Sequence, residues 1–311
     1  MRRRSLLTKN ALNNAPVAVL GALAYDRIAT TQTAFGPGGP GLNCKVSATT
    51  EHLGGCGGNL AFHLSGLGHP PLLLSVTGSD DARYQTALRA KLVDLTGVLR
   101  DPRARCATAY ILSDPNDQQF TAFHSGPDVA ATTWTEHLAA MTAQLASCRL
   151  LLCAPFPPDL MLGTMAFIHQ HNPSALVVWC PGQFADQMDA AMLTACAKYA
   201  HWLVMNKHEA NHIRAHAPEV LSTKTTIITR GTGAVEVLLS SGESKHYPVQ
   251  QVTSVVDPTG SGDAFTAGVV SQLLRDTKQP LTHLDAAIES GIALARQCLT
   301  HQGAQPALSE Q

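Results

Sequence analysis

The most informative segment of this 311-residue chain is Val255-Val256-Asp257-Pro258-Thr259-Gly260-Ser261-Gly262-Asp263-Ala264-Phe265. Small residues at positions 259–262 allow the backbone to turn tightly, and the sequence from Ala264 to Leu274 predicts a helix. Backbone N–H groups should therefore converge at a helix N-terminus, which favours negative charge. The segment predicts an anion-binding turn, although an ordinary capped turn with Asp263 as an N-terminal helix acid has the same local pattern.

A carboxylate beside an anion-binding turn is suited to phosphate transfer. The turn can hold a phosphoryl group while negative charge builds up during transfer. Asp263 lies at the rim of the turn, where it can accept the proton of an attacking hydroxyl group as a general base. We therefore predict a catalytic centre made of Asp263, Gly260, Ser261 and Gly262.

Short apolar runs alternate with helix-length stretches along the rest of the chain. The runs lie at 17–21, 72–76, 149–154, 175–180, 201–206, 225–230 and 234–239, and the helix-length stretches at 80–94, 134–147, 160–171 and 186–199. The runs lack polar alternation, which is typical of strands that are buried on both faces. The alternation predicts an α/β fold in which helices cover a parallel sheet.

Two segments interrupt this alternation. Residues 27–53 carry strand-prone flanks around a glycine-rich turn. Residues 104–124 contain two β-prone runs, 108–112 and 119–124, joined by the turn residues 114–117, which indicates a hairpin. The two segments could be surface decoration, or they could pair into a small β lid over a ligand.

The segment at 255–265 resembles the D-T-x-G-A-G-D-x-F motif of the ribokinase-like (PfkB) carbohydrate and nucleoside kinases, from which it differs at Pro258 and Ser261. Three further motifs occur in the family's order: Gly54-Gly55-Cys56-Gly57-Gly58-Asn59 with Gly66-Leu67-Gly68, then Asn206-Lys207-His208-Glu209, then Thr229-Arg230-Gly231-Thr232-Gly233. They are similar to G-G-x-x-x-N…L-G, N-x-x-E and T-x-G-x-x-G, the last with its final glycine shifted by one residue. The resemblance spans about residues 17–300.

This resemblance implies a three-layer fold and a set of ligands. Residues 15–311 would form a single ribokinase-like domain with a central, mostly parallel sheet, and residues 27–53 and 104–124 would form its β lid. The implied acceptor-substrate ligands are Asp26, Gly55 and Asn59, and the implied ATP-binding residues are Asn206, Thr229, Gly231 and Gly233. Glu209 would organise Mg²⁺ through water, and Asp257 with the Thr259 carbonyl would hold a monovalent cation such as K⁺.

Two segments resemble the bacterial adenosine-kinase-like branch of the family. Residues 118–126 are similar to its N-Q-x-x-A-F-x-x-G motif, and residues 181–183 to its P-G-Q, with Cys180 in place of the aspartate that precedes it. Phe123 or Phe120 could stack on a nucleobase, or both could pack beneath the lid. The resemblance implies that ATP phosphorylates a nucleoside, namely adenosine to AMP, with a ribokinase- or fructokinase-like sugar kinase as the alternative.

Composition narrows the class of partner. Only 14% of residues are charged, the formal net charge is −1 and the sequence pI is about 6.9, so no bulk field attracts nucleic acid or an anionic membrane. No apolar stretch approaches the ~20 residues of a membrane span. The eight cysteines include no C-x-x-C pair, which favours free thiols in a reducing cytoplasm. We expect a cytoplasmic monomer or homodimer with small-molecule ligands, preceded by a disordered tail at residues 1–14.

Two other functions remain open at this stage. His208-Glu209-Ala210-Asn211-His212 matches the H-E-x-x-H pattern of zinc hydrolases, in which two histidines bind zinc and the glutamate activates water. The chain contains 14 histidines, so a chance match is expected, and no third ligand is evident in the sequence. The chain could also be a nucleotide-binding protein that has lost its chemistry, although the glycine turn and Asp263 argue against this.

Overall fold

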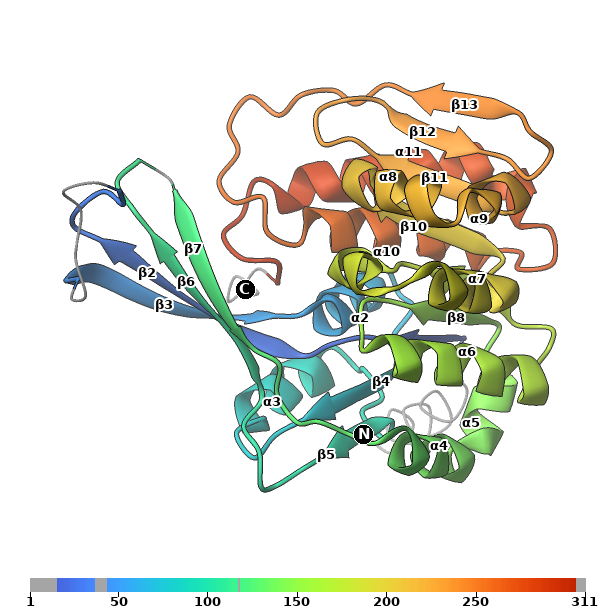
Figure 1. The fold of residues 1–311 in the computed structure, drawn as a ribbon, viewed down its shortest axis with the longest axis horizontal. Coiled ribbons are helices and arrows are strands. Elements are labelled where there is room, and N and C mark those ends of the chain that lie inside the picture. Colours follow the sequence, from blue (N-terminus) through green and yellow to red (C-terminus); the bar gives the residue numbers. More distant parts are fainter. Residues whose placement is uncertain (1–15, 37–43, 117, 306–311) are drawn as a thin grey trace, which may run out of the picture.

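The computed structural model describes residues 16–36, 44–116 and 118–305. These residues form two β-sheets and two layers of helices (Figure 1). The predicted tail at residues 1–14 lies outside the described residues. Within the described part of the chain, no helix combines the length and the apolar character needed to cross a membrane.

The larger sheet, as far as the chain is described, has nine strands in the order β13-β12-β11-β10-β9-β8-β1-β4-β5. Their bounds are β1 (Val17–Leu20), β4 (Leu72–Thr77), β5 (Val98–Arg100), β8 (Leu150–Cys153), β9 (Leu176–Trp179), β10 (Trp202–Asn206), β11 (Thr225–Thr229), β12 (Val235–Leu238) and β13 (Ser244–Tyr247). In this order, all neighbouring strands between β11 and β5 pair in parallel. At the other edge, β12 pairs antiparallel with both β11 and β13. The predicted mostly parallel central sheet is therefore confirmed, and each apolar run in the sequence overlaps one of its strands.

Helices cover both faces of this sheet (Figure 1). One face carries α4 (Ala131–Ala140), α5 (Thr142–Ser147), α6 (Pro158–His171), α7 (Ala190–Tyr199), α8 (Lys207–His216) and α9 (Pro218–Thr223); the other carries α2 (Cys56–Gly66), α3 (Ala82–Ala90), α10 (Ser261–Leu273) and α11 (Leu284–Cys298). Successive strand residues point to opposite faces. In β1, Ala18 and Leu20 enter the core beneath α4–α9, while Val17 and Val19 enter the core beneath α2, α3, α10 and α11.

The two segments that interrupt the alternation pair with each other. They form a smaller sheet with the strand order β3-β2-β6-β7, made of β2 (Ala24–Thr31), β3 (Val46–Gly54), β6 (Ala107–Ser113) and β7 (Gln119–His124). β6 and β7 are the predicted hairpin, and β2 joins it to β3 by pairing in parallel with β6. Figure 1 shows this sheet standing away from the body of the molecule at the left.

Candidate active site

The glycine-rich turn leads directly into α10, as the sequence predicted. Gly260 is the residue before the helix and has a left-handed backbone, with φ +76°. A Cβ atom at this position would lie 2.2 Å from the Cβ of Ala304, so both the conformation and the space require glycine. The backbone N–H of Ser261 donates to the Pro258 carbonyl at 3.2 Å, which closes the turn.

Asp263 lies in the first turn of α10 and faces the N-terminal end of α2. The side-chain amide of Asn59 donates to Asp263 Oδ2 at 2.8 Å, and the Cys56 thiol also hydrogen-bonds to this carboxylate. Burial raises the pKa of Asp263 to about 6; the bonds from Asn59 and Cys56 oppose the shift, and the negative charges of Asp26 and Glu209 add to it. The structure therefore places a carboxylate with raised proton affinity beside the glycine-rich turn.

Asp26 belongs to the same group of charges, although it comes from the smaller sheet. It lies near the start of β2, and its carboxylate packs so closely on Gly54 that a Cβ atom there would be 2.1 Å from Asp26 Oδ2. Burial raises the pKa of Asp26 to about 6, with His52 opposing the shift and Asp257 adding to it. Gly55 precedes α2 and lies against the backbone of Ala22. Asp26 thus lies within electrostatic reach of Asp263, which is bonded to Asn59.

The pairing register places Phe123 on the same face of the smaller sheet as Asp26. Asp26 pairs with Ala109, and Ala109 pairs with Phe123, so the three side chains share one face. Phe120 lies three residues earlier and therefore belongs to the opposite face. Both rings are open to solvent, with 57% of Phe123 and 59% of Phe120 exposed. Only Phe123 is on the face that a ligand held by Asp26 could contact.

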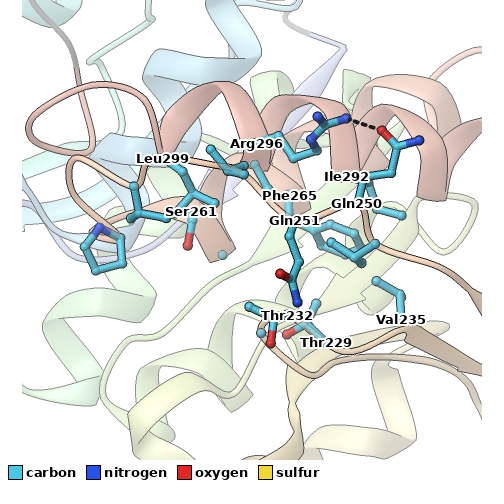
Figure 2. Close-up of a pocket in the computed structure, with 17 residues that line it drawn as sticks. Thr229, Thr232, Val235, Gln250, Gln251, Ser261, Phe265, Ile292, Arg296 and Leu299 are labelled. Carbon is cyan, nitrogen blue, oxygen red and sulfur yellow. Dashed lines mark hydrogen bonds between the residues drawn. The ribbon is translucent and has the colours of Figure 1, made fainter.

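A cavity of about 420 Å³ lies on the other side of the glycine turn (Figure 2). It is lined by Thr229, Gly231, Thr232, Val235, Val249, Gln250, Gln251, Val252, Val255, Pro258, Ser261, Gly262, Phe265, Ile292, Ala295, Arg296 and Leu299. This set joins the predicted ATP-binding residues Thr229 and Gly231 to the predicted anion-binding residues Ser261 and Gly262. Gly233 and Asn206 are not among the lining residues; the Gly233 N–H closes the turn after β11 by donating to the Arg230 carbonyl at 3.0 Å.

The N-x-x-E segment forms a helix cap. Asn206 ends β10, and its side-chain oxygen accepts the backbone N–H of Glu209 at 2.9 Å, while Glu209 accepts the backbone N–H of Asn206 at 3.1 Å. Burial raises the pKa of Glu209, and the bond from the Asn206 backbone opposes this shift. Since Glu209 also raises the pKa of Asp263, the two carboxylates lie within electrostatic reach of each other.

Asp257 and Thr259, the predicted ligands of a monovalent cation, have protein partners. The Asp257 carboxylate accepts the backbone N–H groups of Thr259 at 2.8 Å and Gly303 at 2.9 Å, and the Thr259 carbonyl accepts the Cys298 thiol at 3.5 Å. Burial favours the neutral form of Asp257, but the hydrogen bonds from Thr259 and Gly303 outweigh it and hold the pKa below its usual range. These contacts fix the glycine turn to the segment that follows α11.

Comparison with known proteins identifies the family. Residues 14–311 match the family described as pfkB family carbohydrate kinase. The chain belongs to the pfkB family of carbohydrate kinases. A nucleoside kinase of Methanocaldococcus jannaschii is 23% identical to this kinase over 270 residues, which cover 84% of this chain and 86% of the relative.

Solved structures share the fold of this kinase. The Burkholderia thailandensis nucleoside kinase in complex with inosine has a TM-score of 0.77 and 24% identity, with 93% of this kinase and 91% of that chain covered. A ribokinase from Cryptococcus neoformans in complex with ADP has a TM-score of 0.74 and 19% identity, with 94% and 97% covered. The predicted ribokinase-like fold is therefore confirmed.

The zinc-hydrolase alternative finds no support in this pfkB kinase. His208 and His212 both lie beside Asp186, with His208 Nε2 3.0 Å from Oδ2 and His212 Nδ1 3.5 Å from Oδ1, while Glu209 turns to Asn206. Across the described residues, no group of three or more histidine, cysteine or acidic side chains is arranged to hold a metal ion. The match to H-E-x-x-H reflects a capped, histidine-rich helix.

Most of the cavity wall in this kinase was not predicted from the sequence. The missed residues are the segment 249–252 together with Thr232, Val235, Val255, Pro258, Phe265, Ile292, Ala295, Arg296 and Leu299. Figure 2 shows Arg296 bonded to Gln250, with Arg296 Nη1 donating to Oε1 at 3.2 Å. The spacing of 292, 295, 296 and 299 corresponds to one face of a helix, which is the signal that could have identified them.

Magnesium fits the acidic residues of the site as a hydrated ion. Mg²⁺ keeps several waters and takes one or two carboxylates together with substrate phosphates. Glu209 is one such carboxylate, and burial raises its pKa, which a nearby cation would lower. Cys180 is a buried thiol within electrostatic reach of Glu209 and Asp263, and burial keeps its pKa raised, so it contributes no negative charge.

Proposed function

We propose that this kinase transfers the γ-phosphoryl group of ATP to a hydroxyl group of a purine nucleoside, with adenosine as the expected substrate. One observation carries the proposal: Asp263 has Asp26 and Asn59 on one side, and the cavity lined by Ser261 and Gly262 on the other. The names of two similar proteins, a nucleoside kinase and a nucleoside kinase in complex with inosine, support a nucleoside as acceptor.

The cavity suits the nucleoside part of ATP. Its walls include Val235, Phe265 and Ile292, which offer apolar surface to a flat adenine ring. Its lining also includes Ser261 and Gly262 at the start of α10, where the helix dipole favours the phosphate groups. The γ-phosphate of a nucleotide bound in this way would face Asp263 across the turn.

The acceptor side positions the attacking hydroxyl. Asp26 can accept hydrogen bonds from ribose hydroxyls, and Asn59 keeps one N–H and one oxygen lone pair beyond its protein contacts. Asp263 accepts the proton of the 5′ hydroxyl group. At the same time the hydroxyl oxygen forms the new bond to the γ-phosphorus, and the bond between that phosphorus and the ADP oxygen breaks. The N-terminus of α10 stabilises the transferring group. Magnesium, when bound, neutralises charge on the phosphates.

The smaller sheet would act as the lid of this site. It carries Asp26 on β2 and Phe123 on β7, both on one face. A nucleoside whose ribose is held by Asp26 would bring its base toward this face, where Phe123 can stack on it. Closure of the sheet would exclude water and so limit hydrolysis of ATP.

The first test of this mechanism is the dependence of kcat/KM on pH. Asp263 must be ionised to accept a proton, and its pKa is raised to about 6, as is the pKa of Asp26. We expect kcat/KM to be constant above this range and to fall as the pH is lowered through about 6, with a slope steeper than one proton because both carboxylates take part. In Asp26→Asn, the acid side of the profile should have the slope expected for the titration of a single group. A flat profile down to pH 5 would contradict the assignment of the base.

The second test is a panel of acceptors assayed by release of ADP. We expect adenosine and other purine nucleosides to have higher kcat/KM than ribose or fructose. In Phe123→Ala, the KM for the nucleoside should rise about 10-fold because stacking on the base is lost, while the KM for ATP stays the same. Phe120→Ala is the matched control, since Phe120 lies on the opposite face of β7 and should leave both constants unchanged.

Two outcomes of the same panel would replace this proposal. Higher kcat/KM for free sugars, with no effect of Phe123→Ala, would identify a sugar kinase. This is the alternative function, and a ribokinase is among the similar structures. Binding of ATP without ADP release on any acceptor would identify a nucleotide-binding protein without transfer chemistry.

A further inference from the structure

The segment that follows α11 lies against the predicted catalytic and acceptor residues. Its Gly303 N–H donates to Asp257 Oδ2 at 2.9 Å, and its Ala304 packs on Gly260. The next residue, Gln305, reaches Asn59 on α2, which is 246 positions away in the sequence. The end of the described chain therefore contacts both the turn before α10 and the helix that carries Asn59.

Gln305 stands in the middle of a chain of hydrogen bonds whose direction is fixed at both ends. At one end, the Tyr84 hydroxyl donates to the Gly54 carbonyl at 2.6 Å; at the other, the Asn59 amide nitrogen donates to Asp263 at 2.8 Å. The Tyr84 oxygen and the Asn59 oxygen are both left as acceptors. Gln305 Nε2 lies 2.6 Å from the first and 2.9 Å from the second, and it carries the two protons needed to serve both.

We propose that Gln305 is a positioning residue for phosphate transfer: its amide nitrogen holds the Asn59 oxygen, so that the Asn59 amide nitrogen is turned toward Asp263. This inference rests on the proposed role of Asp263 as general base. If position 305 carried an acceptor instead, the Asn59 amide would be drawn to rotate by half a turn so that its N–H groups meet that acceptor. Its oxygen would then face the Asp263 carboxylate, where two acceptors repel each other.

The other atom of the Gln305 amide argues against a merely structural role. Among the described residues, Gln305 Oε1 is buried and has no hydrogen-bond partner. An unpartnered buried acceptor is costly, and an apolar residue would avoid that cost if packing were the only requirement. Glutamine supplies the double donor that neither an apolar side chain nor an ionised glutamate can provide.

The test compares Gln305→Glu with the wild-type protein, because glutamate keeps the size of the side chain but has no N–H group. We expect kcat/KM to fall by about 10- to 100-fold. The acid limb of the pH profile should also move to higher pH, since the Asn59 bond lowers the pKa of Asp263 and would be lost. Gln302→Ala is the matched control, an exposed glutamine of the same segment that should leave both quantities unchanged.

A double-mutant cycle shows whether Gln305 acts through Asn59. In an Asn59→Ala background, Gln305→Glu should change kcat/KM by less than about twofold, because the residue it positions is gone. Full additivity of the two substitutions, or an unmoved acid limb, would overturn the inference. If Gln305→Glu fails to fold in thermal unfolding, Gln305→Ala enters the same cycle with an expected loss of about 10-fold.

This result is separable from the proposed function. If the wild-type protein transfers phosphate and Asp263→Asn abolishes transfer, but Gln305→Glu matches wild type, the inference about Gln305 is wrong and the function stands. If the wild-type protein transfers phosphate to none of the acceptors in the panel, the proposed function itself is wrong, and the inference falls with it.

Discussion

Asparagine in place of Asp263 should lower kcat for phosphate transfer by a factor of about 10² or more, with the fold intact. The substitution keeps the size of the side chain but removes the group that accepts the proton of the acceptor hydroxyl. Its protein partners are the Asn59 amide and the Cys56 thiol, and the side-chain oxygen of asparagine can still accept a hydrogen bond. The measurement is kcat at pH 8, with the midpoint of thermal unfolding recorded alongside.

The matched control for Asp263→Asn is Asp159→Asn. Asp159 is an acidic residue in the first turn of α6, as Asp263 is in the first turn of α10. Each carboxylate therefore interacts favourably with the dipole of its helix. If Asp263 were only an N-terminal helix acid, the two substitutions should have the same small effect on stability and none on kcat. A near-wild-type kcat for Asp263→Asn would refute its assignment as the general base.

Alanine in place of Gly260 should destabilise the protein by about 1–3 kcal/mol or more and also reduce transfer. The residue has φ +76°, which costs alanine backbone energy, and the new Cβ would collide with Ala304, whose backbone continues to Gln305. Relief of the collision moves the turn away from the segment after α11 and so changes the start of α10. The free energy of unfolding from urea denaturation measures the first effect, and kcat/KM the second.

Gly262→Ala provides the comparison for Gly260→Ala. Gly262 lies two residues further on inside α10, and a Cβ atom there would meet nothing within 4 Å. Alanine is favoured over glycine inside a helix by up to about 1 kcal/mol, so this variant should be as stable as the wild type or more so. Equal stability of all three proteins would show that the turn tolerates a side chain at 260 and that its left-handed conformation is not needed.

Much of the larger sheet follows from local sequence. Runs such as 150–153 are apolar at every position because β8 is buried on both faces, and this pattern is visible without any knowledge of the fold. β13 lacks such a signal, since Ser244, Lys245 and His246 are exposed at the edge of the sheet. The turn before α10 was also predictable, because it depends on neighbouring residues, but the helix begins at Ser261 and not at the predicted Ala264, so Asp263 lies inside its first turn.

The rest of the candidate site depends on contacts that no local pattern records. Gln305 meets Asn59 only because α11 returns the chain to the start of α2, and the segment 249–252 enters the cavity wall without regular structure of its own. The raised pKa of Asp263 is likewise a property of the assembled molecule, since burial causes it and Asp26 and Glu209 strengthen it. The sequence therefore predicted the presence of this carboxylate, whereas its pKa depends on the folded structure.

Because Asp26 and Asp263 are buried, their ionisation, which the proposed mechanism requires, lowers the stability of the folded protein. Each has a pKa of about 6 in the folded protein, against an ordinary value of 3.8 for an aspartate side chain. The folded state therefore binds protons more tightly than the unfolded chain, and the resulting stabilisation is complete below pH 3.8 and lost as the pH rises through about 6. The ionised form that the proposed mechanism requires is thus the less stable one, and ligands that bring positive charge or hydroxyl donors to these carboxylates should stabilise the folded protein as they bind.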